Sequence, residues 1–166
     1  MLGSLKEKLG FGKKAKAEII GAPIEGEAVA ISEVSDPTFG EEIIGKGMAI
    51  RPAVGRVVAP VDGTVAMLFE TKHAVAVTSE AGTEILIHIG LDTVTLKGEH
   101  FTAHAQAGQK VKAGDLLLEF DIEAIKAAGF DVISPVVICN TADFSEIRPT
   151  TGKYVKVLEE VLSLEK

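Results

Sequence analysis

EILIHIGLD at residues Glu84–Asp92 and FETKHAVAV at Phe69–Val77 are two strand-like stretches, and each contains one histidine. In the first, the alternation typical of a β-strand places the isoleucines on one face and His88 on the other. The segment between the two stretches, SEAGT, is polar and contains a glycine, as hairpin turns do. The sequence therefore predicts a β-hairpin that brings His73 and His88 together.

An imidazole set between isoleucines costs free energy unless it has a partner or a chemical task. Two interpretations of His73 and His88 follow. Either each is a separate, hydrogen-bonded histidine of the core, or the two form one site. Their position on facing strands of one hairpin favours the paired site.

Length and composition favour a single domain rich in β-structure. The 166 residues suffice for a substantial core, and this core must be aliphatic because 46% of the chain is hydrophobic but only 5% is aromatic. Seventeen glycines and many short apolar runs predict an all-β fold. We expect residues 19–166 to form an antiparallel β-sandwich or partly closed barrel with a few short helical turns.

A five-residue pattern occurs twice in the first half of the chain. It is APIEG at residues 22–26 and APVDG at residues 59–63. Each copy combines a proline, an acidic residue and a glycine, as turns between strands do. The recurrence predicts a repeated turn and indicates an internal duplication.

Four further segments carry specific structural expectations. Val94–Leu96 is expected to continue as a strand, and residues 98–107 to form one or two helical turns. Residues 122–128 are expected to form a short helix, ended by the glycine that follows. A strand is predicted at Val132–Cys139, and its Pro135 favours an edge position or a bulge.

Charge and cysteine content exclude several classes. The net charge is −7 and the body has no basic stripe, which argues against nucleic acid as a partner. The single Cys139 has no internal disulfide partner, so a buried, inert thiol in a reducing cytosol is expected. No apolar run approaches the length of a membrane span, and no signal peptide is visible.

Residues 1–18 differ from the rest of the chain. They contain five lysines and two glutamates, a local net charge of +3. Leu2, Leu5 and Leu9 would share one face of a helix, although three glycines weaken it. We expect a flexible basic tail; the alternative is a short amphipathic segment that makes peripheral contact with anionic lipid.

Two histidine pairs are candidates for chemistry. His73 and His88 could bind Zn²⁺ only in an open site, because no third and fourth ligand is visible. His100 and His104 have the i, i+4 spacing of helical ligands but lack the glutamate of H-E-x-x-H, so we expect a solvated surface pair. No nucleophile elbow and no P-loop are present. Two imidazoles without a metal suit phosphoryl transfer: one attacks phosphorus and the other steadies the arriving oxygens.

Three motifs resemble the enzyme IIA component of the glucose family in the bacterial sugar phosphotransferase system. They are APVDGTV at residues 59–65, FETKHA at 69–74 and IHIGLDTV at 87–94, and LKGE at 96–99 follows after one further residue. The resemblance runs from about Ile19 to the C-terminus. It implies an antiparallel β-sandwich with a duplicated core, the duplicated hybrid motif.

The resemblance also implies roles for three residues. His88 would be the phosphorylated nucleophile, attacking through Nε2, His73 would stabilise the phosphoryl group, and Thr71 would orient His73. The phosphoryl group would come from HPr and pass to a cysteine on the IIB domain of a sugar permease, in the cytoplasm and without a required cofactor. In enteric relatives the unphosphorylated form also inhibits transporters and glycerol kinase, with Zn²⁺ shared between the two histidines and a partner's glutamate.

A partner-binding surface around the histidines is implied as well. Its residues would be Asp36, Phe39, Ile43, Ile44, Phe69, Asp92 and Val94. Val75 stands where relatives often carry an aromatic residue, which predicts a less bulky apolar collar in this chain. An exposed apolar surface with acidic residues at its rim is typical of a docking site.

Two other functions stay open on the sequence alone. Gly108–Asp115 resembles the turn of biotinyl and lipoyl carrier domains, although no lysine occupies the modified hairpin pattern. A zinc peptidase of the related duplicated fold would need an H-x-H pair with an upstream histidine and aspartate, and here Ile89-Gly90 follows His88.

Overall fold

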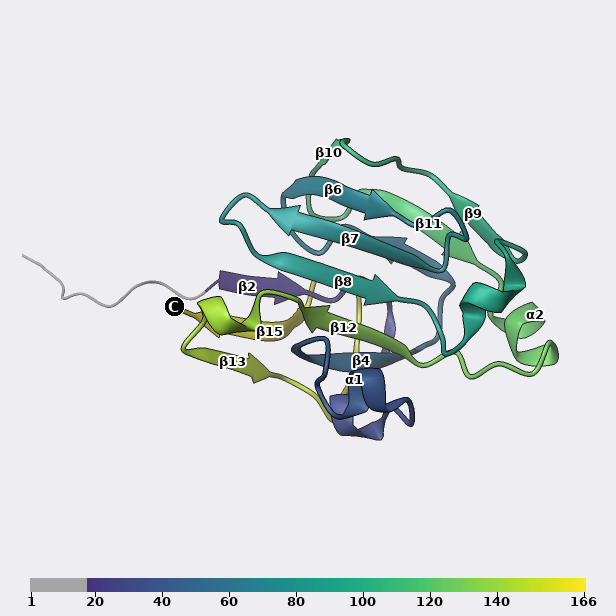
Figure 1. Ribbon diagram of the computed structural model, residues 1–166, viewed down its shortest axis with the longest axis horizontal. Helices are drawn as coiled ribbons and strands as arrows, with labels where there is room; N and C mark the ends of the chain where they lie inside the picture. Colours follow the sequence, from purple (N-terminus) through teal and green to yellow (C-terminus); the bar gives the residue numbers. More distant parts are fainter. Residues whose placement is uncertain (1–17) are drawn as a thin grey trace, which may run out of the picture.

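The computed structural model describes residues 18–166, which form three antiparallel sheets (Figure 1). The large sheet contains, in spatial order, β10 (Lys110–Val111), β6 (Gly63–Leu68), β7 (Ala74–Ser79), β8 (Glu84–His88), β12 (Ser134–Ile138), β4 (Lys46–Pro52), β3 (Gly26–Ala30) and β14 (Lys153–Val155). One small sheet contains β5 (Arg56–Val58), β11 (Leu116–Phe120) and β9 (Phe101–Ala103), and the other β13 (Glu146–Pro149), β15 (Glu160–Glu165) and β2 (Glu18–Gly21). The predicted all-β sandwich is confirmed.

Short helical turns connect the strands. They are η2 (Ile31–Glu33), α1 (Pro37–Gly40), η3 (Thr93–Leu96), α2 (Ile122–Ala127) and η4 (Thr141–Asp143). The predicted helix at residues 122–128 is confirmed: Asp121 caps it by accepting a hydrogen bond from the Ala124 N–H, and Gly129 follows in a left-handed conformation. Within residues 18–166, no helix is long and apolar enough to cross a membrane.

The expected tail, residues 1–18, lies outside the described residues except for Glu18. Glu18 is instead the first residue of β2, and its carboxylate accepts a hydrogen bond from the buried Thr83 hydroxyl in the turn between β7 and β8. Lipid contact by the remaining tail residues stays a prediction.

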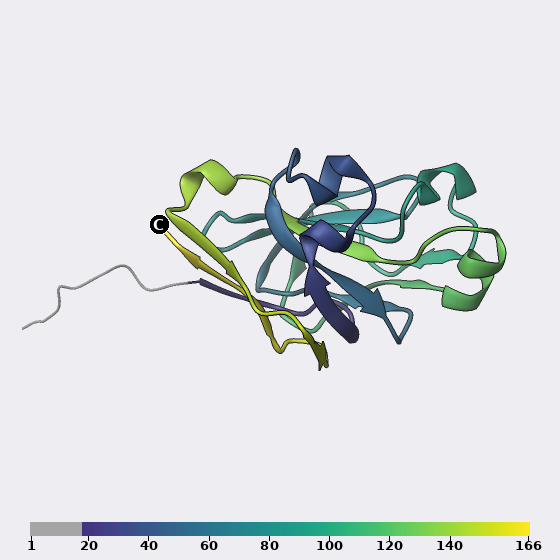
Figure 2. The ribbon, with the colours of Figure 1, turned by 90° about the horizontal axis from the view of Figure 1, so that it is seen from below.

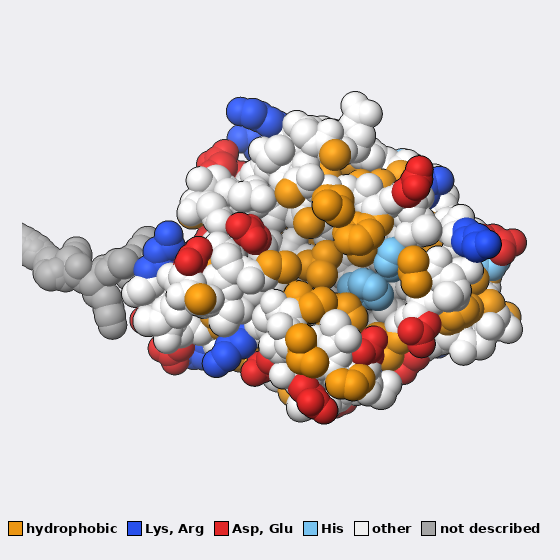
Figure 3. Space-filling model, in the orientation of Figure 1, with side chains coloured by type: hydrophobic (Ala, Val, Ile, Leu, Met, Phe, Trp, Pro, Cys, Tyr) orange, Lys and Arg blue, Asp and Glu red, His pale blue; other side chains and the backbone are white. Residues whose placement is uncertain are grey.

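The core is a layer of aliphatic side chains enclosed by the sheets. Figure 2 shows the sheets from a second direction. Val75, Val77, Ile85 and Ile87 enter it from the hairpin of β7 and β8, and each is almost completely buried. Because side chains alternate along a strand, Leu86 and His88 leave β8 on the opposite, outer face of the sheet. Figure 3 shows histidine side chains next to hydrophobic ones on the face of the molecule turned to the viewer.

The repeated turns pair with one another. The Val58 N–H donates to the Pro23 carbonyl at 2.9 Å, and the Gly21 N–H donates to the Pro60 carbonyl at 3.2 Å. Val58 and Gly21 each lie two residues before the repeated proline, so the two bonds are reciprocal. The strands after the turns also match: β3 pairs with β14, and β6 pairs with β10. The repeat is therefore an internal duplication in three dimensions.

Three local expectations are wrong. Val94–Leu96 belongs to the 3-10 turn η3, and Phe101–Ala103 forms β9 instead of a helical turn. The strand β12 lies inside the large sheet, with β8 on one side and β4 on the other. Pro135 is tolerated there because its register partner is Ala49 on β4, whereas pairing with β8 begins only at Val136.

Cys139 is exposed, so the expected buried thiol is also wrong. It follows β12 at the edge of the core, where its N–H donates to the Glu84 carbonyl at 2.8 Å. Partial burial and the Glu84 carboxylate raise the pKa of the thiol, which keeps it protonated at neutral pH.

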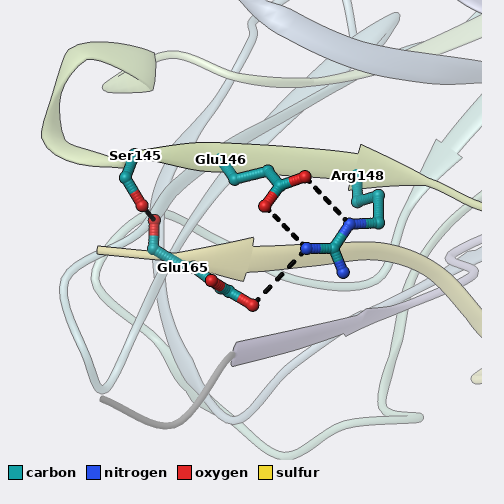
Figure 4. A network of polar contacts seen from close by, with 4 residues as sticks. All are labelled: Ser145, Glu146, Arg148 and Glu165. Carbon is teal, nitrogen blue, oxygen red and sulfur yellow. Dashed lines mark hydrogen bonds and ion pairs between the residues drawn. The ribbon is translucent and has the colours of Figure 1, made fainter. Parts of the chain in front are cut away.

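Arg148 links side chains at the surface of the small sheet of β13, β15 and β2 (Figures 1 and 4). The Arg148 guanidinium donates to Glu146 on the same strand at 2.6 and 3.1 Å and to Glu165 on β15 at 3.5 Å. The Ser145 hydroxyl donates to the Glu165 main-chain carbonyl at 3.2 Å. These contacts link β15 to β13 beside the backbone pairing of the two strands.

Candidate functional site: a pair of imidazoles

Pairing of β7 with β8 brings the two histidines together. His88, the last residue of β8, pairs with Ala74, the first of β7, and the Ile89 N–H donates to the His73 carbonyl at 2.7 Å. The two ring centroids lie 4.9 Å apart, with the planes at 84°. The predicted hairpin and the predicted meeting of the two rings are both confirmed.

Each ring is held through its Nδ1 atom. His88 Nδ1–H donates to the Gly90 carbonyl oxygen at 2.8 Å. Because a carbonyl can only accept, the neutral form of His88 carries its lone pair on Nε2. Thr71 Oγ1 lies 2.6 Å from His73 Nδ1, as expected for a residue that orients this ring. Nε2 of each ring is thus left for a ligand.

Burial keeps both rings neutral. Desolvation, and to a smaller extent the neighbouring His88, lowers the pKa of His73 to about 4. Desolvation also lowers the pKa of His88, opposed by its bond to the Gly90 carbonyl and by the carboxylates of Asp36 and Asp92. At neutral pH the pair therefore offers unprotonated nitrogen to an electrophile or a metal ion.

Two phenylalanines flank the pair. The Phe39 ring lies 4.8 Å from the His88 ring between centroids, and the Phe69 ring lies 5.4 Å from the His73 ring, edge to face. Phe39 is held by α1, which Asp36 caps by accepting a hydrogen bond from the Thr38 N–H at 3.0 Å. The same carboxylate thus both begins the helix that buries Phe39 and acts electrostatically on His88.

The expected collar divides into exposed and buried members. Ile43 and Val94 are 70% and 48% exposed, whereas Ile44 is half-buried against the smaller core that contains Phe39. Val75 points into the main core and is completely buried, so it has no place in the collar and the expectation of a less bulky collar at this position was wrong. Alternation along β7 explains this, because Val75 and Val77 share the inner face.

Sequence reasoning missed a row of apolar residues beside the histidines. Met67, Ala76 and Leu86 are cross-strand neighbours on β6, β7 and β8. Met67 is 51% exposed and the other two are half-buried. Figure 3 shows that the hydrophobic surface continues from the histidines across the upper strands. Leu86 was predictable from the sequence, because it lies two residues before His88 and alternation places both on one face. Ala76 and Met67 become its neighbours only through strand register.

His100 and His104 are not part of this site. His100 precedes β9 in a left-handed conformation, and His104 Nε2 lies 2.8 Å from Glu119 Oε1. His100 and Glu119 line a polar hollow beside α2. The expected surface location is confirmed.

A complete metal centre is absent from the described residues: no three histidine, cysteine or acidic side chains among residues 18–166 are grouped closely enough to hold an ion. His73 and His88 could supply two ligands through Nε2, and tetrahedral Zn²⁺ would need others from elsewhere. A zinc peptidase, which needs at least three protein ligands, does not fit this arrangement.

Fold and site together define an all-β protein with a duplicated core and a paired-histidine surface. Residues 18–144 match the family model of the phosphoenolpyruvate-dependent sugar phosphotransferase system, EIIA 1. The chain belongs to this family, and the biotinyl, lipoyl and peptidase alternatives are not favoured.

Relatives and a solved structure agree. The chain is 48% identical over 147 residues to the glucose-specific EIIA component of Bacillus cereus, covering 89% of each. It is 57% identical over 128 residues to the beta-glucoside-specific EIIBCA component of Bacillus subtilis, covering 77% of this chain but only about a fifth of that relative. The glucose permease IIA of Mycoplasma capricolum superposes with a TM-score of 0.83 at 34% identity, over 93% of this chain and 99% of that chain.

Proposed function

We propose that this protein is a phosphocarrier that receives a phosphoryl group from phospho-HPr on His88 Nε2 and passes it to a cysteine of a permease IIB domain. The observation that carries the proposal is the paired-ring geometry: two neutral imidazoles, 4.9 Å apart, each held through Nδ1 on an apolar surface. Membership of the EIIA family, a component of a phosphotransferase system, supports this proposal.

The first step is attack of the His88 Nε2 lone pair on phosphorus. The N–P bond forms as the donor's bond to phosphorus breaks, and that electron pair leaves with the donor. Because Nδ1 keeps its proton, the ring becomes positively charged. The Gly90 carbonyl and the carboxylates of Asp36 and Asp92, which raise the pKa of His88, stabilise this charge for the same electrostatic reason.

His73 steadies the transferred group. If the Thr71 hydroxyl donates to Nδ1 across the 2.6 Å contact, the proton of neutral His73 lies on Nε2, ready to donate to a phosphoryl oxygen. Desolvation keeps this ring from taking a second proton, so it acts as a neutral hydrogen-bond donor. Phosphoryl transfer depends mainly on positioning and charge stabilisation, which is what this arrangement supplies.

The apolar surface supplies docking for both partners. Ile43, Met67 and Val94 are exposed, and Asp36 and Asp92 lie near enough to act on His88. Apolar contact excludes water from the reacting nitrogen, and the carboxylates suit arginine or lysine on HPr or IIB. The EIIBCA name of one relative combines an A domain with a B domain, which supports IIB as the acceptor.

We propose as a second function that the unphosphorylated pair binds Zn²⁺ together with a carboxylate of a regulated transporter or kinase. The specific support is that both Nδ1 atoms are already engaged. His88 Nε2 carries a lone pair, and His73 Nε2 gains one when the Thr71 hydroxyl accepts from Nδ1–H in place of donating to it, so both Nε2 atoms can then bind a metal. Phosphorylation of His88 would remove one ligand, so binding would be confined to the unphosphorylated form. Zinc-dependent partner binding that persists after His88→Gln would contradict this function.

Reconstitution tests the main proposal. The full chain is incubated with phosphoenolpyruvate, enzyme I and HPr, and then with IIB domains from a glucose permease and from a beta-glucoside permease. We expect acid-labile phosphate on the chain, a phosphorus–Nε2 linkage by NMR, and transfer to at least one IIB. A chain that takes up no phosphoryl group, or takes it on another residue, would refute the assignment.

A further inference from the structure

A buried threonine in the loop after β8 has no role in the transfer described so far. Thr93 is completely buried, and its hydroxyl donates to the Ile89 carbonyl oxygen. Gly90, the next residue after Ile89, is the one whose carbonyl accepts from His88 Nδ1–H. The threonine therefore acts on the peptide unit directly before the carbonyl that fixes the reactive ring.

Two planar peptide units meet at the Cα atom of Gly90, and both are held. The unit before Gly90 carries the Ile89 oxygen, which Thr93 binds. The unit after it carries the Gly90 oxygen and the Leu91 N–H, which donates to the Asp131 carbonyl at 3.0 Å. Since the backbone turns only about the bonds at Cα, fixing both planes fixes the direction of the Gly90 carbonyl.

This turn needs such restraint because its backbone is unusual. Gly90 has a φ of 73°, and Asp92, a residue with a side chain, has a φ of 62°. Left-handed conformations at residues other than glycine persist where the surroundings over-determine them. The Thr93 methyl adds a packing contact, because a Cβ atom on Gly90 would lie only 2.7 Å from Thr93 Cγ2.

We infer that Thr93 is a positioning residue that holds the turn at Ile89–Leu91, keeps the Gly90 carbonyl on His88 Nδ1–H and thereby keeps the lone pair of His88 on Nε2. The inference rests on the proposed function only in that Nε2 is taken as the phosphorylated atom. Without the carbonyl, the single proton of neutral His88 is free to move to Nε2, where it removes the nucleophilic lone pair.

A pair of substitutions separates the hydroxyl from the methyl. Thr93→Val keeps the shape but replaces the donor, and Thr93→Ser keeps the donor but removes the methyl. Thr95→Val is the matched control, since the Thr95 hydroxyl lies in the same loop but donates to the Asp92 main-chain carbonyl oxygen at 2.8 Å and not to the Ile89 carbonyl. Thr93→Ala removes the hydroxyl without placing a methyl against the Ile89 oxygen, and it replaces Thr93→Val if that variant does not fold.

The primary measurement is the tautomer of His88 in the full chain, read from the imidazole ¹⁵N shifts at neutral pH. We expect the Nδ1–H form in the unsubstituted protein, Thr93→Ser and Thr95→Val, and a mixture of forms in Thr93→Val or Thr93→Ala. The rate of phosphoryl transfer from phospho-HPr should fall about tenfold in the hydroxyl-free variants, with HPr affinity unchanged.

A purely structural threonine would behave differently. It would lower the melting temperature of Thr93→Val or Thr93→Ala and leave the His88 tautomer as it is, and that result would overturn the inference. The tautomer is read without any phosphoryl donor. If the unsubstituted chain takes up no phosphate while the tautomer still depends on Thr93, the proposed function fails and the positioning role stands.

Discussion

The molecule contains two histidine pairs whose environments differ completely. His73 and His88 lie fifteen positions apart in sequence, yet their rings meet at 4.9 Å on an apolar surface. His100 and His104 are only four positions apart, but His100 lines a polar hollow and His104 pairs with Glu119. By sequence spacing alone, His100 and His104 would be the better candidates for metal ligands.

The difference shows what makes an imidazole reactive here. His73 and His88 each have Nδ1 bound, phenylalanine rings alongside and a lowered pKa. His104 instead has its Nε2 engaged with the carboxylate of Glu119 in solvent, so the nitrogen that His73 and His88 keep for a ligand is already occupied. Strand pairing, burial and a fixed tautomer therefore distinguish the two pairs, and the predictions that follow test each in turn.

The largest expected effect is loss of phosphorylation in His88→Gln. Glutamine keeps a similar volume but has no nucleophilic lone pair on nitrogen, so we expect no acid-labile phosphate after incubation with phosphoenolpyruvate, enzyme I and HPr. His104→Gln is the matched control and should be labelled at the rate of the unsubstituted chain. Equal phosphate labelling of His88→Gln and His104→Gln would show that the two histidine pairs do not differ in reactivity.

A smaller but still large effect is expected for His73→Gln. The attacking nitrogen remains, so His88 should accept a phosphoryl group at close to the normal rate. Onward transfer to IIB should fall about 100-fold or more, the usual cost of removing one donor to a developing oxyanion. Separate quench-flow measurements of the two half-reactions check this, and normal transfer to IIB would contradict the stabilising role.

The third prediction compares the stability of two variants, each with a glycine near one histidine pair replaced by alanine. In Gly90→Ala the new Cβ would lie 2.7 Å from Thr93 Cγ2 and 2.8 Å from the Asp131 carbonyl oxygen, with φ at 73°. Gly108, four positions after His104, has φ of 90° and open space. We expect Gly108→Ala to lose about 1 kcal/mol of unfolding free energy and Gly90→Ala about 3 kcal/mol.

Denaturant unfolding measures both glycine variants. Gly90→Ala should also accept a phosphoryl group more slowly, because the displaced turn carries the carbonyl that holds His88. Equal losses of stability in the two variants would show that the turn after β8 is not tightly packed.

Much of the fold followed from local pattern. Alternation in residues 84–92 and a glycine turn were enough to predict the hairpin, since both signals lie within one short segment. The β9 strand could not be read because it has three residues and is defined by its pairing with β11. Pro135 misled for a similar reason, as the ladder on the β8 side happens to begin one residue later.

The site was predictable where it depends on local sequence and not where it depends on register. Val65 and Met67 are two residues apart and should share a face, yet Val65 is buried and Met67 is half-exposed. A β-bulge between them shifts the register against β7 and turns Met67 outward. Nothing in the sequence marks this bulge, so the apolar row through Met67 was missed.

A fourth, moderate effect concerns pH. His73 has a folded-state pKa of about 4, against about 6.5 in the unfolded chain. Between these values the unfolded state binds a proton that the folded state does not, so stability falls as pH drops from about 6.5 to about 4 and then levels off. His73→Gln should lose less stability over this range in urea titrations, and an unchanged pH profile would place His73 in solvent.

The smallest effect is expected at the other pair. His104 Nε2 and Glu119 Oε1 lie 2.8 Å apart, but their side chains are 36% and 46% exposed. Water and salt screen such a pair, so its coupling free energy should be below about 1 kcal/mol. A double-mutant cycle of His104→Gln and Glu119→Gln in urea measures the coupling, and phosphoryl transfer should stay normal in all three variants. A coupling well above that limit would show that solvent does not screen the His104–Glu119 pair. Slowed phosphoryl transfer would mean that this pair also supports the reactive histidines.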